Sequence, residues 1–314
     1  MVPTLTEEFY LKRINVDISS HCMLKCPRCI RQKPGYEKGS DITVKNFDKI
    51  CKAFKNIAMM GSASDCIYHH DFISILDVCV KNGNSVNIHT NGHGKSDKWW
   101  DKVIDKCKEL NDVKFVFALD GLPEESEMYR IGQDGEAVWK IMKKVRNRGF
   151  KVVWQYIVFS YNEDHIEEAK QMALDNDIDF TVLLSSRWDG VNDIYKPSKY
   201  FLERPVRIED KGLIPSCKLP NGYNPVYLST GYFMPCCDIK YSDKTMSLYS
   251  DKFNINNVID LKTDVFQSKE WVEFYQSIDT NPCSICITSC SNHWIREVTK
   301  TYKPDGSVII VERN

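Results

Sequence analysis

Short apolar runs alternate with longer amphipathic stretches over residues 12–184, and this alternation limits the chain to a small set of folds. The short runs are rich in Val, Ile, Phe and Tyr, which favour buried strands. We predict strands at 12–18, 57–60, 85–89, 113–119, 151–159 and 180–184, and helices at 43–56, 71–81, 98–110, 136–147 and 163–175. Such alternation predicts parallel strands with right-handed crossovers. Because six units are too few to close an eight-fold barrel, the predicted fold is α/β, a partial (β/α)6 barrel.

The amino-acid composition of the chain changes near residue 185. Pro, Gly, Asn and Ser become frequent, and a helical period returns only at 262–277. Turn residues predict two hairpins, one joining 224–229 to 232–234 and the other joining 299–302 to 307–312. We therefore predict two domains, with a boundary inside 186–200. Residues 1–190 form the barrel, and residues 191–314 form a small Cys-rich domain of β-hairpins and a helix.

Charge and hydropathy exclude some classes of protein. The 314 residues carry a formal net charge of -1, so no overall field attracts bulk nucleic acid. No apolar run reaches the roughly 18 residues of a membrane span. The first eight residues lack the basic and then apolar order of a secretory signal. We expect a cytoplasmic protein with no membrane partner.

Thirteen cysteines are many for a cytoplasmic chain, and most of them fall into groups. Disulfide frameworks are typical of small secreted scaffolds, whereas grouped cysteines indicate metal. The cysteines that stand singly among apolar residues are interpreted as small buried hydrophobic residues: Cys51, Cys66, Cys79 and Cys107.

Cys22, Cys26 and Cys29 follow the first predicted strand directly, in the spacing C-x3-C-x2-C. Functional sites of α/β folds lie beyond the carboxyl ends of the strands, so the three thiols are expected there. Three thiolates leave one iron of a 4Fe–4S cluster with an open coordination position. Structural zinc is the alternative, because zinc takes four closed ligands and His21 would complete the set.

This spacing resembles the signature of the radical S-adenosylmethionine (radical SAM) enzymes, and later motifs in residues 10–184 follow the order of that family. Met60-Gly61-Ser62-Ala63 stands where the family has Gly-Gly-Glu, which holds the SAM amino group. Runs similar to the family's strand ends are His89-Thr90-Asn91-Gly92 and Leu119-Asp120-Gly121. The resemblance implies a 4Fe–4S cluster at Cys22, Cys26 and Cys29, with SAM on its open iron.

The resemblance also implies which residues contact SAM. They are Gly61, Ser62, Ala63, Asn91, Asp120, Arg130 and Arg28. Arg130 corresponds to an arginine that pairs with the SAM carboxylate. The usual Glu is absent here, so backbone carbonyls, Ser62 or Asp65 must accept from the ammonium. Arg28 replaces an aromatic residue that stacks near adenine, and a guanidinium can also stack on a purine.

The C-terminal cysteines resemble the auxiliary-cluster domain of SPASM/Twitch radical SAM enzymes. Three elements carry this likeness: Cys217, Gly231-x4-Cys236 and Cys283-x2-Cys286. Since the SPASM pattern needs more cysteines than the tail supplies, the likeness favours the single-cluster Twitch form. It implies a second 4Fe–4S cluster on Cys217, Cys236, Cys283 and Cys286, with Cys237 and Cys290 as alternates. A structural zinc site remains the other interpretation.

The family's chemistry implies reductive cleavage of SAM to a 5′-deoxyadenosyl radical, which abstracts hydrogen from a substrate. We expect a small-molecule or nucleotide substrate, a flavodoxin- or ferredoxin-type electron donor and an oxidoreductase of the dehydrogenase type, with the auxiliary cluster accepting an electron. Candidate bases near the last strand ends are Arg187, Asp189, Tyr156 and Gln155, although ion pairing of the first two and core packing of the other two explain them more readily.

Two other functions stay open. One is a SPASM-type enzyme that modifies peptides or proteins. The other is a non-catalytic iron–sulfur electron carrier or a zinc-stabilised binding module, which would need no SAM contacts at the strand ends.

Overall fold

The computed structural model describes residues 12–61, 63–185, 193–198, 225–235, 248, 250–278, 280–283, 286 and 297–313. Within these residues the strands form one ten-stranded sheet in the order β10-β9-β6-β5-β4-β3-β2-β1-β7-β8. Its centre is a parallel run of β1 (Arg13–Val16), β2 (Asn56–Met59), β3 (Ser85–Thr90), β4 (Val113–Ala118), β5 (Lys151–Val158) and β6 (Asp179–Leu184). The α/β fold with parallel strands is confirmed.

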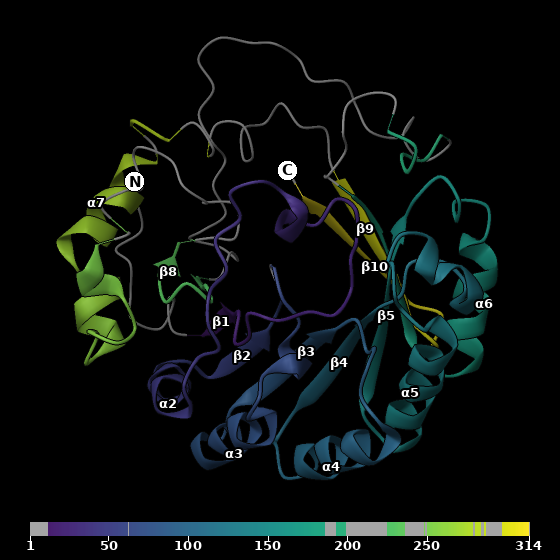
Figure 1. The fold of residues 1–314 in the computed structure, drawn as a ribbon, viewed down its shortest axis with the longest axis horizontal. Coiled ribbons are helices and arrows are strands. Elements are labelled where there is room, and N and C mark those ends of the chain that lie inside the picture. The colour runs from purple at the N-terminus through teal and green to yellow at the C-terminus, as the bar shows by residue number, and fades with distance from the viewer. Residues whose placement is uncertain are drawn as a thin grey trace.

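The helices that connect these strands lie along one side of the sheet (Figure 1). They are α2 (Val44–Ala53), α3 (Phe72–Asn82), α4 (Asp97–Cys107), α5 (Gly135–Asn147) and α6 (Ile166–Asp175). Local sequence sets their starts, because the side chains of Thr43, Ser96 and Asp134 each accept from a backbone N–H in the first turn. Gly83 ends α3 at a φ of 68°, a left-handed backbone that glycine adopts without strain.

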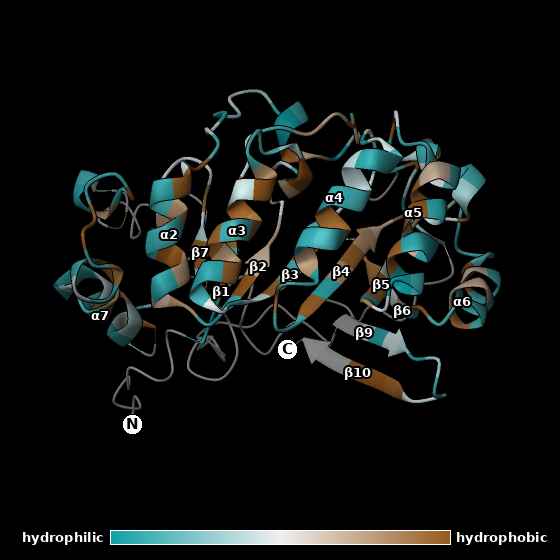
Figure 2. Cartoon of the chain, turned by 90° about the horizontal axis from the view of Figure 1, so that it is seen from below, coloured by the Kyte–Doolittle hydropathy of each residue, from teal (hydrophilic) through white to brown (hydrophobic). Residues whose placement is uncertain are grey.

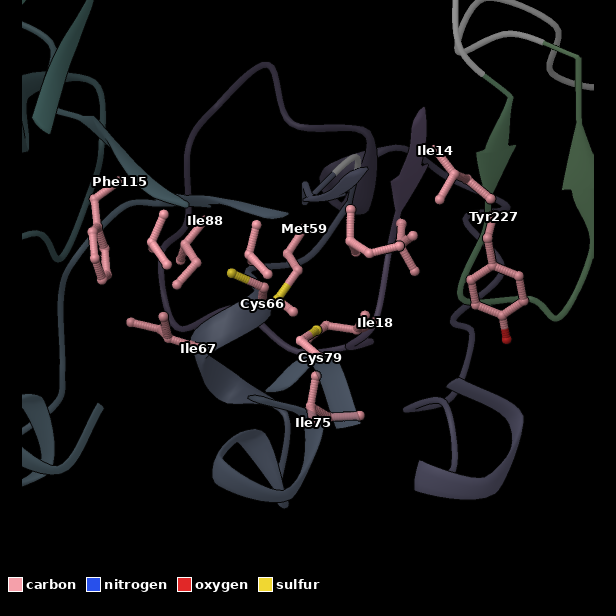
Figure 3. Packing of buried hydrophobic residues seen from close by; sticks show 14 of the residues in the cluster. Ile14, Ile18, Met59, Cys66, Ile67, Ile75, Cys79, Ile88, Phe115 and Tyr227 are labelled. Atoms are coloured by element: carbon pink, nitrogen blue, oxygen red, sulfur yellow. The ribbon is translucent and has the colours of Figure 1, made fainter. Parts of the chain in front are cut away.

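The core lies between the sheet and these helices. Ile14 and Val16 of β1 point into it, and so do Ile88 of β3 and Phe115 of β4, all fully buried. In Figure 3, Ile88, Met59 and Ile18 from the sheet side meet Cys79 and Ile75 from α3. Side chains alternate between the two faces of a strand, so the residues between these positions face the other side of the sheet. There the chain is polar: Arg13, Asn15, Asn87 and Lys114 are half-buried.

The C-terminal segments extend the same sheet at both edges. β7 (Val226–Tyr227) pairs with β1 in parallel, and β8 (Phe233–Met234) completes the first predicted hairpin. At the other edge β9 (Glu297–Tyr302) pairs antiparallel with β6 and forms the second hairpin with β10 (Val308–Arg313). Figure 2 shows this second hairpin beside β6. The sheet thus continues across the predicted boundary near residue 190, and the division into two domains stays a prediction.

The helix predicted at 262–277 is interrupted. A π-helical turn, η8 (Lys262–Phe266), precedes α7 (Lys269–Ser277). Ser268 lies between them, and its hydroxyl accepts from the backbone N–H of Trp271, so a new helix begins there. The spacing of hydrophobic residues in the sequence does not reveal such a break.

The C-terminal segment packs on the barrel through α2. The ring of Phe266 meets that of Phe54 edge to face, with 5.4 Å between centroids. The ammonium of Lys49 donates to the carbonyls of Ile255 at 2.9 Å and Val258 at 2.7 Å. Among the helices described, none has the length and apolar character needed to cross a bilayer.

We expect Phe266→Ala to lower the free energy of unfolding by roughly 3–5 kcal/mol, because the ring is buried against the barrel. Urea denaturation followed by circular dichroism measures the change. The exposed Ile259→Ala serves as the control and should change stability by less than about 0.5 kcal/mol. Equal effects of the two changes would show that the C-terminal segment does not stabilise the barrel.

Candidate active site

A cavity of about 380 Å³ opens at the carboxyl ends of the parallel strands. Each strand of the barrel contributes to it, either directly or through the loop that follows. Its polar lining comes from Cys22, Cys26, Cys29, Arg31, Ser64, Asp65, His89, Thr90, Asn91, Tyr129, Arg130, Gln155 and Ser185. The three predicted cluster ligands therefore line one cavity with four of the predicted SAM contacts, Gly61, Ala63, Asn91 and Arg130.

The loop after β1 is wound around the guanidinium of Arg31. This group donates to the carbonyls of Cys22 at 2.9 Å and Leu24 at 2.5 Å. The backbone N–H of Cys29 donates to the carbonyl of Cys26 at 3.1 Å, which closes a tight turn. These bonds curl the loop so that its three thiols face the cavity.

The donor set fits an iron–sulfur cluster. All three cysteines are half-buried and are in no disulfide among the described residues. Burial, and then the negative charge of Asp65, raises the pKa of Cys22 to about 11, and burial also raises the pKa of Cys26. Without a metal these two thiols would remain protonated, and a bound metal cation would reverse that by favouring thiolates.

His21 does not complete a four-ligand set with these thiols. Its Nδ1 lies 3.3 Å from Oδ1 of Asp41, and its Nε2 lies 3.3 Å from Nζ of Lys38. It is absent from the lining of the cavity and half of its side chain is exposed. The zinc interpretation that uses His21 is therefore not supported by this geometry.

Gly61 and Asp65 follow β2. A Cβ on Gly61 would lie 1.9 Å from the carbonyl oxygen of Ser64, so only glycine fits this turn. The buried carboxylate of Asp65 accepts from the backbone N–H of Asn91 at 2.6 Å, from Thr90 Oγ1 at 3.1 Å and from the N–H of Ile67 at 3.2 Å. Burial, partly offset by these bonds, raises the pKa of Asp65 to about 6. Both oxygens are thus already engaged. Of the other predicted contacts here, Ala63 lines the cavity and Ser62 lies outside the described residues.

Asn91 links the third strand end to the cysteine loop. Its Nδ2 lies 3.4 Å from Sγ of Cys22, within donating distance of a thiolate. The backbone of Asn91 is fixed from two sides, since Asp65 accepts from its N–H and Gln133 Nε2 donates to its carbonyl at 2.7 Å. The predicted Asn91 therefore lies against a cluster ligand.

Asp120 and Arg130 form an ion pair beside the cavity, with 2.7 Å between Nε and Oδ2. Burial disfavours the charge of Arg130, but Asp120 more than offsets this and raises its pKa. Asp120 also accepts from the backbone N–H of Ile157 at 3.0 Å. Arg130 lines the cavity, whereas the fully buried Asp120 does not. Asp120, predicted as a SAM contact, instead holds Arg130 in place.

Arg28 does not line the cavity. Its Nε lies 2.7 Å from Oδ2 of Asp193, and its guanidinium lies 5.7 Å from the ring centre of Tyr195. Aromatic surface comes instead from Tyr129 and Phe159, which line the cavity and stack on each other with 4.0 Å between ring centroids. Tyr129 directly precedes Arg130 in the sequence, so its position could have indicated it.

Two of the candidate bases, Gln155 and Tyr156, lie on opposite faces of β5. Gln155 lines the cavity, whereas Tyr156 points to the opposite face of β5 and donates to the carbonyl of Asn162 at 2.6 Å. Neighbouring residues of a strand face opposite sides, so Tyr156 lies in the core, and its role as a base stays a prediction. Arg187 and Asp189 lie outside the described residues.

The predicted auxiliary site is described only in part. Cys283 and Cys286 are buried, with 3.0 Å between their sulfur atoms. That spacing allows two thiolates to share one metal centre. Cys217, Cys236, Cys237 and Cys290 lie outside the described residues.

We expect Asp65→Asn to lower the free energy of unfolding by about 1–3 kcal/mol, because an amide NH2 would face one of the backbone donors and leave it unpaired. Thermal unfolding measures the change. Asp71→Asn, which changes an exposed carboxylate at the start of α3, is the matched control. If the two variants unfold alike, Asp65 does not organise the strand ends.

Comparisons with known proteins give the family. The model of the Radical SAM superfamily matches residues 16–173. A stretch of 145 residues is 27% identical to the tungsten-containing aldehyde ferredoxin oxidoreductase cofactor-modifying protein of Pyrococcus furiosus, and the match covers 44% of this chain and 39% of that protein. This chain therefore matches about two fifths of the length of that relative.

Solved structures share the fold at low sequence identity. Streptococcus suis SuiB bound to S-adenosylmethionine superposes with a TM-score of 0.63 at 15% identity, over 89% of this chain and 72% of SuiB. SuiB has also been solved bound to its precursor peptide SuiA. The protein anSMEcpe with bound AdoMet and the Cp18Cys peptide gives a TM-score of 0.57 at 16% identity, over 86% of this chain and 83% of that one. The family match and the cysteine-lined cavity lead to one conclusion: this chain belongs to the radical SAM superfamily.

Proposed function

We propose that this enzyme uses radical SAM chemistry to abstract a hydrogen atom from a peptide substrate. The observation that carries the proposal is the meeting of three thiols with Arg130 in one cavity at the strand ends. Membership of the family implies a 4Fe–4S cluster and SAM. A bound cluster and SAM supply one-electron cleavage of a carbon–sulfur bond, which yields a 5′-deoxyadenosyl radical.

The chain's own residues bind and orient. Cys22, Cys26 and Cys29 are proposed to hold the cluster, and Arg130 is proposed to pair with the SAM carboxylate. Asp120 supports this role, because a buried ion pair keeps the guanidinium charged and fixes its direction. The stacked rings of Tyr129 and Phe159 give the cavity an apolar wall, which excludes water and competing hydrogen donors.

A peptide substrate is favoured over the small molecule or nucleotide expected from sequence. Two proteins that share this fold have been solved with peptides bound. The P. furiosus relative is named for modifying a cofactor, which supports a small-molecule substrate, but its match spans less of this chain. A peptide substrate therefore becomes the first interpretation, and a small-molecule or nucleotide substrate becomes the second.

We also propose an auxiliary cluster at Cys283 and Cys286, completed by Cys217 and Cys236, with Cys237 and Cys290 as alternates. The burial and closeness of the first two sulfur atoms support it. In this proposal the second cluster accepts an electron from the substrate, the reaction is of the oxidoreductase type, and a flavodoxin- or ferredoxin-type protein supplies the reductant.

Replacing one predicted cluster ligand tests the reaction. We expect Cys26→Ala to reduce formation of 5′-deoxyadenosine from SAM and dithionite to background, because two thiols do not hold the cluster. Cys107→Ala is the matched control, since that thiol is on the buried face of α4 and does not line the cavity. Cys283→Ala should retain part of the activity. Normal cleavage of SAM by Cys26→Ala contradicts the proposal.

Arg130 is tested by separating stability from affinity. Arg130→Gln leaves Asp120 buried without a counter-charge, so we expect a loss of about 3–5 kcal/mol of stability. The double variant Asp120→Asn/Arg130→Gln should recover most of that loss and still bind SAM roughly tenfold or more weakly, since the carboxylate contact is gone. Equilibrium dialysis with labelled SAM measures the affinity. Wild-type affinity in the double variant would remove Arg130 from the SAM site.

A further inference from the structure

The inner face of the barrel holds two basic side chains that have no acidic partner. Arg13 on β1 and Lys114 on β4 are both half-buried and face the side of the sheet opposite the helices. Among the described residues, no carboxylate lies within ion-pair distance of either. Burial lowers the pKa of both groups, and for Lys114 the nearby charge of Arg13 lowers it further. Keeping unpaired cations inside a barrel destabilises a fold.

The nearest carboxylates, Asp112 and Asp179, form no ion pair with Lys114 or Arg13 within the described residues. Asp112 lies 3.3 Å from Lys151, on the exposed end of β5. Asp179 at the start of β6 is in no ion pair within the described part of the chain. Burial raises its pKa, and Lys303 is the cation that lowers it most, ahead of Lys114. Lys114 therefore feels the charges of Asp179 and Asp112 only at a distance, and half-buried Arg13 has no carboxylate partner among the described residues.

The strand register places Lys114 one row below the cavity lining, and Arg13, which pairs with Asn56, one row lower still. Asn87 is paired with Lys114 and Asn15 with Ala58, which pairs in turn with Asn87, so these residues form one row across the sheet. His89 is paired with Val116 one row higher, toward the carboxyl ends. Two residues of a strand span roughly 6–7 Å, which is the separation of the two rows. His89 and Val116 line the cavity, and the row of Lys114 lies beneath them.

Buried polar atoms in the rows of His89, Lys114 and Arg13 also lack hydrogen-bond partners within the described residues. His89 Nε2, Asn15 Oδ1 and Arg13 Nε are buried and make no hydrogen bond within the described residues. Burial, followed by the charges of Lys114 and Arg13, lowers the pKa of His89 to about 3. The ring is therefore neutral at physiological pH, and its Nε2 is available as a donor in one tautomer. The field of the two cations reaches the floor of the cavity.

We infer that the floor of the barrel, formed by Arg13, Lys114 and His89, binds an anionic group of the substrate, a carboxylate or a phosphate. A substrate held by its anionic end below His89 would leave its other carbons above, beside the loop of Cys22, Cys26 and Cys29. This inference rests on the proposed function, because it takes the cavity as the space for substrate. In a peptide, the carboxylate of an acidic side chain supplies such a group.

Calorimetric titration of the reconstituted protein with glutarate tests the inference, with glutaramide as the uncharged molecule of similar shape. We expect glutarate to bind and glutaramide not to bind. Lys114→Met and Arg13→Met should each weaken glutarate binding roughly tenfold or more. Lys151→Met is the matched control, because Lys151 neighbours Lys114 in the register but is exposed and paired. Inorganic phosphate, titrated in parallel, distinguishes a carboxylate site from a phosphate site.

Binding of neither anion by the wild type, equal binding of glutaramide, or unchanged affinity in Lys114→Met would each overturn the inference. The titration uses no reductant and no turnover, so its outcome is independent of the Cys26 experiment. A second measurement reads the folded state directly. Without ligand, Lys114→Met should raise Tm by about 2 °C or more, since it removes an unpaired buried charge. A lower Tm would show that Lys114 has a structural partner and would also overturn the inference.

Discussion

The buried carboxylate of Asp65 joins the ends of two strands to the cysteine loop. Its own backbone N–H donates to the carbonyl of His21 at 2.8 Å, next to Cys22. Its side chain accepts from Thr90 and Asn91 at the end of β3, and Asn91 contacts the sulfur of Cys22. Hydrogen bonds to a charged group are each worth about 1.5–3 kcal/mol, so this carboxylate contributes much of the order at the strand ends. Displacing it would change the spacing of the thiols as well as the turn after β2.

A second buried carboxylate, that of Asp120, also joins neighbouring loops at the strand ends. Asp120 follows β4, accepts from a backbone N–H of β5 and holds Arg130. Parallel strands end at one edge of the sheet, so a carboxylate placed after a strand can join neighbouring loops. The chain departs from its family at the Glu of the Gly-Gly-Glu motif and at the aromatic residue before the third cysteine. Near the first place Asp65 accepts from the backbone N–H of Asn91, and at the second Arg28 pairs with Asp193.

The fold was predictable because its signals are local. Each strand of the barrel lies within about two residues of its predicted place, since a run of β-branched and aromatic residues is buried on one face and bounded by polar turns. The cysteine spacing likewise identified residues that share a cavity. Side-chain direction was harder to predict. Gln155 and Tyr156 are adjacent in the sequence, and only the register of β5 decides which of them faces the cavity. The resemblance assigned Arg28 to SAM, whereas the structure pairs it with Asp193, 165 residues away in the sequence. A contact over that distance leaves no local pattern, and the same is true of the continuation of the sheet by β7 and β9.

The two faces of the sheet serve different purposes, and the difference explains why the barrel tolerates polar residues inside. The helical side is packed with Ile14, Ile88 and Phe115, all fully buried, and it supplies most of the hydrophobic stabilisation. The opposite side carries Arg13, Asn15, Asn87 and Lys114, whose partial burial opposes folding. A parallel sheet with helices on both sides would be apolar on both faces. Here the inner face of the barrel encloses a cavity, so it need not be apolar. Polar groups that weaken the fold are retained there, where a ligand can offset the cost of their desolvation.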